Sequence, residues 1–133
     1  MGVGIILSNK ILIVEDDDSR IAWFKSELVG NSLHITKKAK DAIKLLKLHT
    51  YGLIFLDHDL AEQHYIDNRC YDGTGPEVAK FLADTKENNN GAVIIIHSLN
   101  IYGVDRMFDL LQGRTVAKIN YLLLKQKGIA AFI

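Results

Sequence analysis

The stretches ILIVEDD at residues 11–17 and LIFLD at residues 53–57 decide the fold. Each is a short, almost continuous apolar run that ends in acidic residues. Runs of this kind are typical of strands buried on both faces, as in a parallel sheet that is covered by helices. We therefore predict that residues 11–14 and 53–56 form strands of one parallel sheet, with the acids at their carboxyl ends.

Three further apolar runs, at residues 33–36, 92–96 and 115–119, are also predicted strands. The segments between the runs carry apolar residues at the spacing of an amphipathic helix. These residues are Ile21, Phe24 and Leu28; Ala39, Ile43 and Leu46; Val78, Phe81 and Leu82; and Val104, Met107, Phe108 and Leu111. The alternation predicts an α/β fold, a (βα)₅ doubly wound parallel sheet with the flavodoxin-like strand order 2-1-3-4-5.

Several residues are typical of helix ends. Asp18 and Ser19 are candidate caps for the first helix, because their side chains can accept hydrogen bonds from free backbone N–H groups. Gly113 is a fitting stop for the fourth helix. Residues 121–133 could form a fifth helix, which Gly128 would interrupt.

Composition limits the classes of function. The chain has 133 residues and 48% hydrophobic content, which suit one domain over residues 1–133 with no output domain. Its 16 basic and 16 acidic residues balance, so we expect neither sequence-specific DNA binding nor attachment to a membrane surface. No apolar run approaches the ~20 residues of a membrane helix. The single cysteine, Cys70, and the lack of a signal-like N-terminus predict a cytoplasmic protein.

Acidic side chains follow two of the predicted strands. They are Glu15, Asp16, Asp17 and Asp18 after the first strand, and Asp57 and Asp59 after the third. These strands are neighbours in the order 2-1-3-4-5, so the acids should converge on one pocket at the carboxyl edge of the sheet. Carboxylates packed closely repel one another unless a cation lies among them, and oxygen ligands suit Mg²⁺ or Mn²⁺. Capping and turn roles explain Asp18 and Asp59 equally well, but explain Asp16 and Asp57 poorly.

The two acidic motifs resemble those of the response-regulator receiver domain, the CheY-like superfamily. The resemblance covers nearly the whole chain and implies that Glu15 and Asp16 form a metal-binding pair. A slip of one residue at the strand end would make the pair Asp16 and Asp17 instead. The resemblance also implies that Asp57 is the phosphoacceptor and that Asp59 lends a backbone carbonyl to the metal.

The same resemblance implies two further site positions. The pair His97-Ser98 stands where a receiver carries a Thr or Ser that contacts the phosphoryl group. Lys118 stands where the receiver's salt-bridging lysine belongs. Such charges would neutralise a phosphoryl group under attack by a carboxylate, so that positioning and electrostatics carry the catalysis.

Three features depart from an ordinary receiver: His58 in LDHDL, the HSLN motif in place of Thr-Ala or Ser-Ala, and an isoleucine after Lys118 in place of proline. Together with DGTG and the following Glu-Val, they resemble the divergent branch called the cyclic-phosphate-processing receiver domain. The run Asp17-Asp18-Ser19-Arg20 reproduces that branch's Asp-Asp-x-Arg element. The motifs suggest four candidate substrate contacts, namely Arg20, Asp72, Thr74 and Asn100.

Two histidines could carry chemistry in such a site. His58 and His97 follow adjacent predicted strands and could act as general acid and base across a phosphodiester. The alternative, equally compatible with the sequence, is that each is a hydrogen-bonded residue beside an acid.

Three functions are compatible with these residues. The first is Mg²⁺-dependent processing of cyclic or terminal phosphates on a small molecule, a nucleotide or an RNA end, which would need both histidines. The second is a stand-alone response regulator, phosphorylated on Asp57 by a histidine kinase and acting on a separate output protein. The third is a degenerate receiver that serves as a protein-interaction module and would tolerate loss of Asp57.

Overall fold

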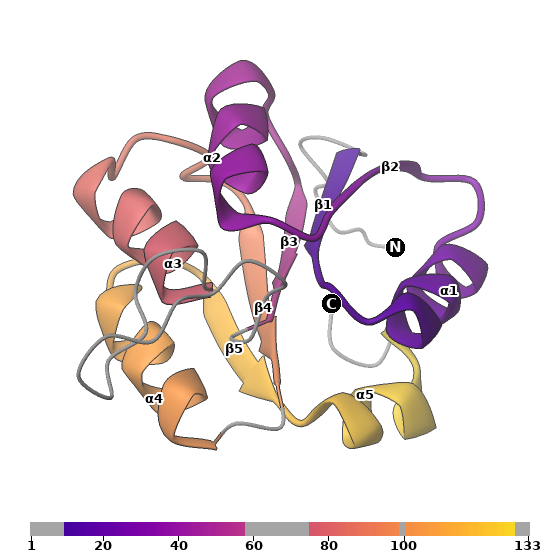
Figure 1. Cartoon of the computed structure of the whole chain (residues 1–133). Helices are drawn as coiled ribbons and strands as arrows, with labels where there is room; N and C mark the ends of the chain where they lie inside the picture. The colour runs from indigo at the N-terminus through magenta and orange to yellow at the C-terminus, as the bar shows by residue number, and fades with distance from the viewer. Residues whose placement is uncertain (1–9, 58–74, 99–100, 130–133) are drawn as a thin grey trace, which may run out of the picture.

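The computed structural model describes residues 10–57, 75–98 and 101–129, and within them strands and helices alternate along the chain (Figure 1). The strands are β1 (Lys10–Val14), β2 (Ser32–Thr36), β3 (Leu53–Leu56), β4 (Val93–His97) and β5 (Val116–Ile119). The helices are α1 (Asp18–Glu27), α2 (Ala39–Leu48), α3 (Gly75–Asp84), α4 (Ile101–Leu110) and α5 (Tyr121–Lys127).

The strands form one parallel sheet in the order β2-β1-β3-β4-β5. This confirms the predicted α/β fold and strand order. Each predicted strand lies within one residue of the observed one. The central strands β1, β3 and β4 are buried on both faces, whereas the edge strands β2 and β5 are partly exposed.

The side chains of each strand alternate between two helical layers, since successive residues of a strand point to opposite faces. On one face the strands pack against α2, α3 and α4 through residues such as Val14, Leu56 and Ile96. On the other face, residues such as Ile13 and Phe55 pack against α1 and α5. Figure 1 shows these two groups of helices on opposite sides of the sheet.

The helix ends refine two predictions. The first helix is capped by Asp17, not by Asp18 or Ser19: the Asp17 Oδ1 accepts the backbone N–H of Arg20 at 3.0 Å. The fifth helix ends at Lys127 because Gly128 adopts a φ of 85°, a conformation that favours glycine. Among the described residues, none of the helices combines the length and apolar character needed to cross a bilayer.

Candidate functional site

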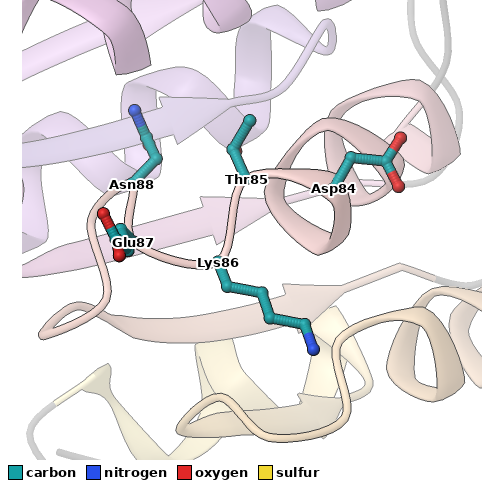
Figure 2. A pocket seen from close by; sticks show the side chains of 5 residues that line it. All are labelled: Asp84, Thr85, Lys86, Glu87 and Asn88. Atoms are coloured by element: carbon teal, nitrogen blue, oxygen red, sulfur yellow. The ribbon is translucent and has the colours of Figure 1, made fainter.

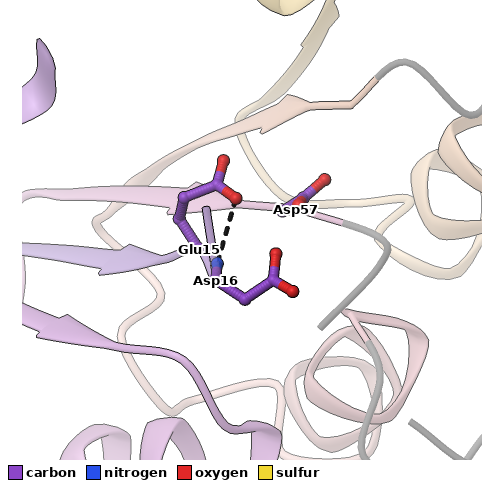
Figure 3. A group of neighbouring side chains, drawn as sticks. All are labelled: Glu15, Asp16 and Asp57. Atoms are coloured by element: carbon purple, nitrogen blue, oxygen red, sulfur yellow. Dashed lines mark hydrogen bonds between the residues drawn. The ribbon is translucent and has the colours of Figure 1, made fainter. Parts of the chain in front are cut away.

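Three carboxylates meet where the central strands end. Glu15 directly follows β1 and Asp57 directly follows β3, and the register pairs Val14 with Leu56. The Asp57 N–H donates to the Val14 carbonyl at 3.0 Å, which fixes the two strand ends side by side. Glu15, Asp16 and Asp57 each offer one carboxylate oxygen, and these oxygens lie within 4.8 Å of one another (Figure 3). Three of the acids that were expected to converge, Glu15, Asp16 and Asp57, therefore do so.

The Glu15 carboxylate is fully buried and is held on both oxygens. Its Oε1 lies 3.0 Å from His97 Nε2, and its Oε2 accepts the backbone N–H groups of Asp16 at 3.0 Å and Asp17 at 3.1 Å. Burial raises the pKa of this carboxyl group, but the hydrogen bond and charge of His97 and the backbone N–H of Asp17 together outweigh it. The net pKa is lowered, so Glu15 is the acid of the cluster that most readily stays ionised.

The pKa of Asp57 shifts in the opposite direction from that of Glu15. Burial raises its pKa to about 8, and the neighbouring charge of Glu15 adds to the shift, while a hydrogen bond from Ser98 opposes it. Burial and the charge of Glu15 also raise the pKa of Asp16. Burial and the charge of Glu15 thus disfavour the ionised forms of both Asp57 and Asp16.

Arg20 contributes a positive charge to the cluster from α1. Its Nη1 lies 3.6 Å from Glu15 Oε1 and 3.7 Å from Asp57 Oδ2. The guanidinium group is stacked over the Tyr121 ring at 5.0 Å, at the start of α5. Both helices pack on the same face of the sheet, so packing between α1 and α5 positions the Arg20 side chain.

His97 is buried completely, at the end of β4. Its ring packs against Phe24 at 5.0 Å, Phe55 at 6.0 Å and Tyr121 at 6.5 Å, all measured between centroids. Its Nε2 contacts Glu15, and its Nδ1 has no hydrogen-bond partner among the described residues. A general acid or base must reach the substrate. This position instead suits a residue that holds Glu15 in place.

Lys118 is directed away from the cluster. Its Nζ pairs with Asp105 Oδ1 at 2.7 Å and lies 5.0 Å from the centre of the Phe108 ring, both on α4. The strand register explains this: Lys118 pairs with Ile96, whose side chain faces the α4 layer, whereas His97, the next residue, faces α1 and α5. In this structure Lys118 therefore pairs with Asp105 and not with the clustered acids, and its expected role at the site stays a prediction.

The other predicted site residues fall into two groups. Asp17 and Asp18 are exposed at the start of α1; Asp17 caps the helix, and Asp18 pairs with Lys37 at 2.6 Å, so neither joins the cluster. Of the four acids after β1, Glu15 and Asp16 lie in the cluster, and their role as a metal-binding pair stays a prediction. Five residues lie outside the described residues, namely His58, Asp59, Asp72, Thr74 and Asn100.

The sequence analysis did not identify Tyr121 as a site residue. It touches both Arg20 and His97 through its ring and is buried at the first position of α5. The available signal was its place two residues after the last predicted strand, at the same edge of the sheet as the acids.

A hollow of about 430 Å³ lies far from the carboxylates, along the turn from α3 into β4 (Figure 2). Five consecutive residues, 84–88, line it, and their side chains point in different directions (Figure 2). The Arg114 guanidinium ties this turn together by donating to the carbonyls of Thr85 and Asn88 at 3.0 and 2.7 Å. No polar groups converge in the hollow, so the carboxylate cluster remains the candidate site.

Solved receiver structures are similar to this chain. Response regulator TrrA of Thermotoga maritima, in complex with Mg²⁺-BeF, is 23% identical with a TM-score of 0.61 over 93% of this chain and 98% of that one. A CheY-like receiver domain protein of Methanospirillum hungatei is 16% identical with a TM-score of 0.65 over 93% and 90%. These likenesses show the fold. No curated protein matches the sequence.

The family model described as "Cyclic-phosphate processing Receiver domain" matches residues 11–113. The match runs from β1 to the turn after α4, so it includes the carboxylate cluster, Arg20 and His97, and it extends over most of the chain. An Asp-rich pocket of this kind, at the carboxyl edge of a receiver sheet, is consistent with the handling of phosphoryl groups. The chain belongs to the family of cyclic-phosphate-processing receiver domains.

Proposed function

We propose that the carboxylate cluster is a divalent-cation-dependent centre that processes cyclic or terminal phosphates of nucleotides or RNA ends. The observation that carries the proposal is the meeting of three carboxylate oxygens within 4.8 Å beside a single guanidinium group. Among the described residues, three carboxylates beside one guanidinium group form a set of ligands that suits a cation and the phosphate that it would help to bind.

The donor atoms fit a hard cation. All three are carboxylate oxygens, which Mg²⁺ and Mn²⁺ prefer, and burial together with the charge of Glu15 raises the pKa of both Asp57 and Asp16. Asp16 and Asp57 would hold the ion, with Glu15 oriented beside them by His97. The Mg²⁺-BeF complex of the similar T. maritima response regulator supports the choice of Mg²⁺. When bound, such an ion supplies charge that neutralises phosphoryl oxygens.

The chain's own residues would then divide the remaining work. Ser98 hydrogen-bonds the Asp57 carboxyl group and so fixes its orientation. In the first step an Asp57 oxygen would attack phosphorus and form an acyl phosphate, while the ester P–O bond breaks and the released alkoxide takes a proton from water. In the second step water would cleave the acyl phosphate and restore the carboxylate. His97, fully buried, keeps Glu15 in place and does not contact the substrate.

The test compares two classes of phosphate. Purified protein would be incubated in Mg²⁺ with 2′,3′-cyclic nucleotides and, separately, with acetyl phosphate, following ring opening by chromatography and phosphorylation by mass spectrometry. Asp57→Asn should abolish turnover of the cyclic substrate. The matched control is Asp84→Asn, an exposed acid that pairs with Lys80 on the far side of the molecule and should behave as wild type. Turnover that survives Asp57→Asn would refute the proposal.

A second function, a response regulator phosphorylated by a histidine kinase, is favoured by one observation. The Ser98 hydrogen bond to Asp57 places a hydroxyl group beside the carboxylate that would accept the phosphoryl group. Phosphate retained on wild type after acetyl phosphate treatment, lost in Asp57→Asn and accompanied by no change in the cyclic nucleotides, would establish this function in place of the first.

A further inference from the structure

We propose that Arg20, held against Tyr121, has replaced Lys118 as the phosphate-binding cation of the site, and that its guanidinium fork selects phosphodiesters. This inference rests on the proposed function. It goes further because it names the residue that binds the phosphate, the residue that positions it and the class of phosphate that it prefers.

Among the described residues, the strand register turns Lys118 away from the acids and leaves Arg20 beside them. The Lys118 ammonium group is committed to Asp105 at 2.7 Å on the face of the sheet that α4 covers. The Arg20 guanidinium group lies on the other face, beside the carboxylates. Among the described residues, no other Lys or Arg forms an ion pair with any of the three clustered acids.

The Arg20 guanidinium group is held in position, but most of its hydrogen-bond donors are not used. Its Nη1 lies 3.6 and 3.7 Å from Glu15 and Asp57, beyond the range of a good hydrogen bond, and no other hydrogen bond of its side chain occurs among the described residues. The Tyr121 ring supports the group from behind at 5.0 Å. Most of its five N–H donors are therefore available to a ligand, and little side-chain freedom remains to be lost on binding.

The geometry and charge of the fork indicate which phosphate it prefers. A guanidinium group binds two oxygens of one anion through parallel N–H bonds. A cyclic phosphodiester has two non-bridging oxygens and a single negative charge, which match this fork. A terminal monoester has a third non-bridging oxygen and a second charge; the fork leaves that oxygen unpaired, and the three carboxylates oppose the charge. Arg20 should therefore favour the cyclic ester over the monoester.

Ligand binding can be followed through Trp23, the only tryptophan of the chain. The centroid of its ring lies 5.6 Å from the ring centroid of Tyr121, which is the residue that supports Arg20. The experiment titrates the full chain, in Mg²⁺, with 2′,3′-cyclic CMP and with 3′-CMP, and records tryptophan fluorescence with calorimetry as an independent measure.

Arg20→Gln should weaken binding of the cyclic ester by tenfold or more, a loss of about 1.4 kcal/mol or greater. Arg20→Lys keeps the charge but loses the fork, so it should restore binding only in part and should lessen the preference for the cyclic ester. Lys118→Met, the matched control on β5, should bind within about twofold of wild type, since a surface ion pair contributes little.

Tyr121 is tested as a positioning residue. Tyr121→Phe keeps the ring and should bind as wild type, whereas Tyr121→Leu should weaken binding even when its thermal midpoint is unchanged. If Tyr121→Leu does not fold, the Arg20 variants decide the question alone. Unchanged affinity in Arg20→Gln, or a loss in Lys118→Met as large as that in Arg20→Gln, would overturn the inference and leave the proposed function standing. Wild type that binds neither ester in Mg²⁺ would overturn both.

Discussion

Asp57 carries its carboxyl group in surroundings that favour the protonated form. Burial, together with the charge of Glu15, raises its pKa to about 8, far above its ordinary value of 3.8. Between these two values the folded protein binds a proton that the unfolded chain does not. The free energy of unfolding therefore decreases as the pH rises through this window. Without a bound cation, the fold is less stable at neutral pH because of its own site.

The pH dependence of stability tests this sign. In EDTA, urea unfolding of wild type from pH 5 to 8 should include a declining contribution of at most about 1.4 kcal/mol per pH unit. Asp57→Asn should remove it and stabilise the protein most at pH 8. The difference between the two proteins is the quantity to measure, because burial lowers the pKa of His34, which gives an opposite slope near the same range. Identical slopes in both proteins would contradict the prediction.

His97 and Glu15 form the most deeply buried polar pair of the site. His97→Phe removes the side-chain donor from a buried carboxylate and should cost about 2 kcal/mol in urea unfolding. His97→Gln keeps an N–H donor and should recover part of the loss. The double variant with Glu15→Gln should lose less than the sum of the two single losses. Additive losses would show that the two residues are not coupled.

At the scale of the elements, α1 delivers Arg20 and begins at a capping residue. Asp17→Ala removes the side-chain acceptor of the Arg20 backbone N–H and should cost about 1 kcal/mol of stability, measured by urea unfolding. Asp17→Asn is the control, since asparagine caps as well as aspartate. A wild-type free energy of unfolding in Asp17→Ala would show that the cap does not hold the helix.

The elements could be predicted because their signals are local. Continuous apolar runs located the five strands, and three- and four-residue spacing located the helices. The direction of Lys118 was not predictable in the same way, because it depends on register: a shift of one position along β5 decides whether a side chain faces α4 or the acids. The sequence shows a lysine near the strand end, but it does not show to which face of the sheet that lysine points.

At the scale of the whole molecule, cation binding should stabilise the fold. An ion that binds only the folded state adds RT ln(1 + [L]/Kd), about 2.7 kcal/mol at a concentration of 100 Kd. Mg²⁺ or Mn²⁺ should therefore raise the thermal midpoint of wild type, and Asp16→Asn should reduce the increase. Asp105→Asn, which alters an exposed acid on α4, should retain it. An equal increase in all three proteins would point to a general effect of the salt.

The site was predictable to the extent that it is built from strand ends. The proximity of Glu15, Asp16 and Asp57 could be predicted because parallel strands end at one edge of the sheet. The partners of His97 and the stacking of Arg20 on Tyr121 could not, since they join segments far apart in the chain through packing between layers.

The two faces of the sheet differ in what they contribute to the site. Glu15, Asp57, His97 and their partners Arg20 and Tyr121 all belong to the side of α1 and α5. Among the described residues, α2 and α4 contribute no side chain to the cluster, and their outer surfaces are free to change without disturbing it. Descendants of this fold could therefore exchange one set of binding partners for another over those two helices while inheriting the same carboxylate cluster.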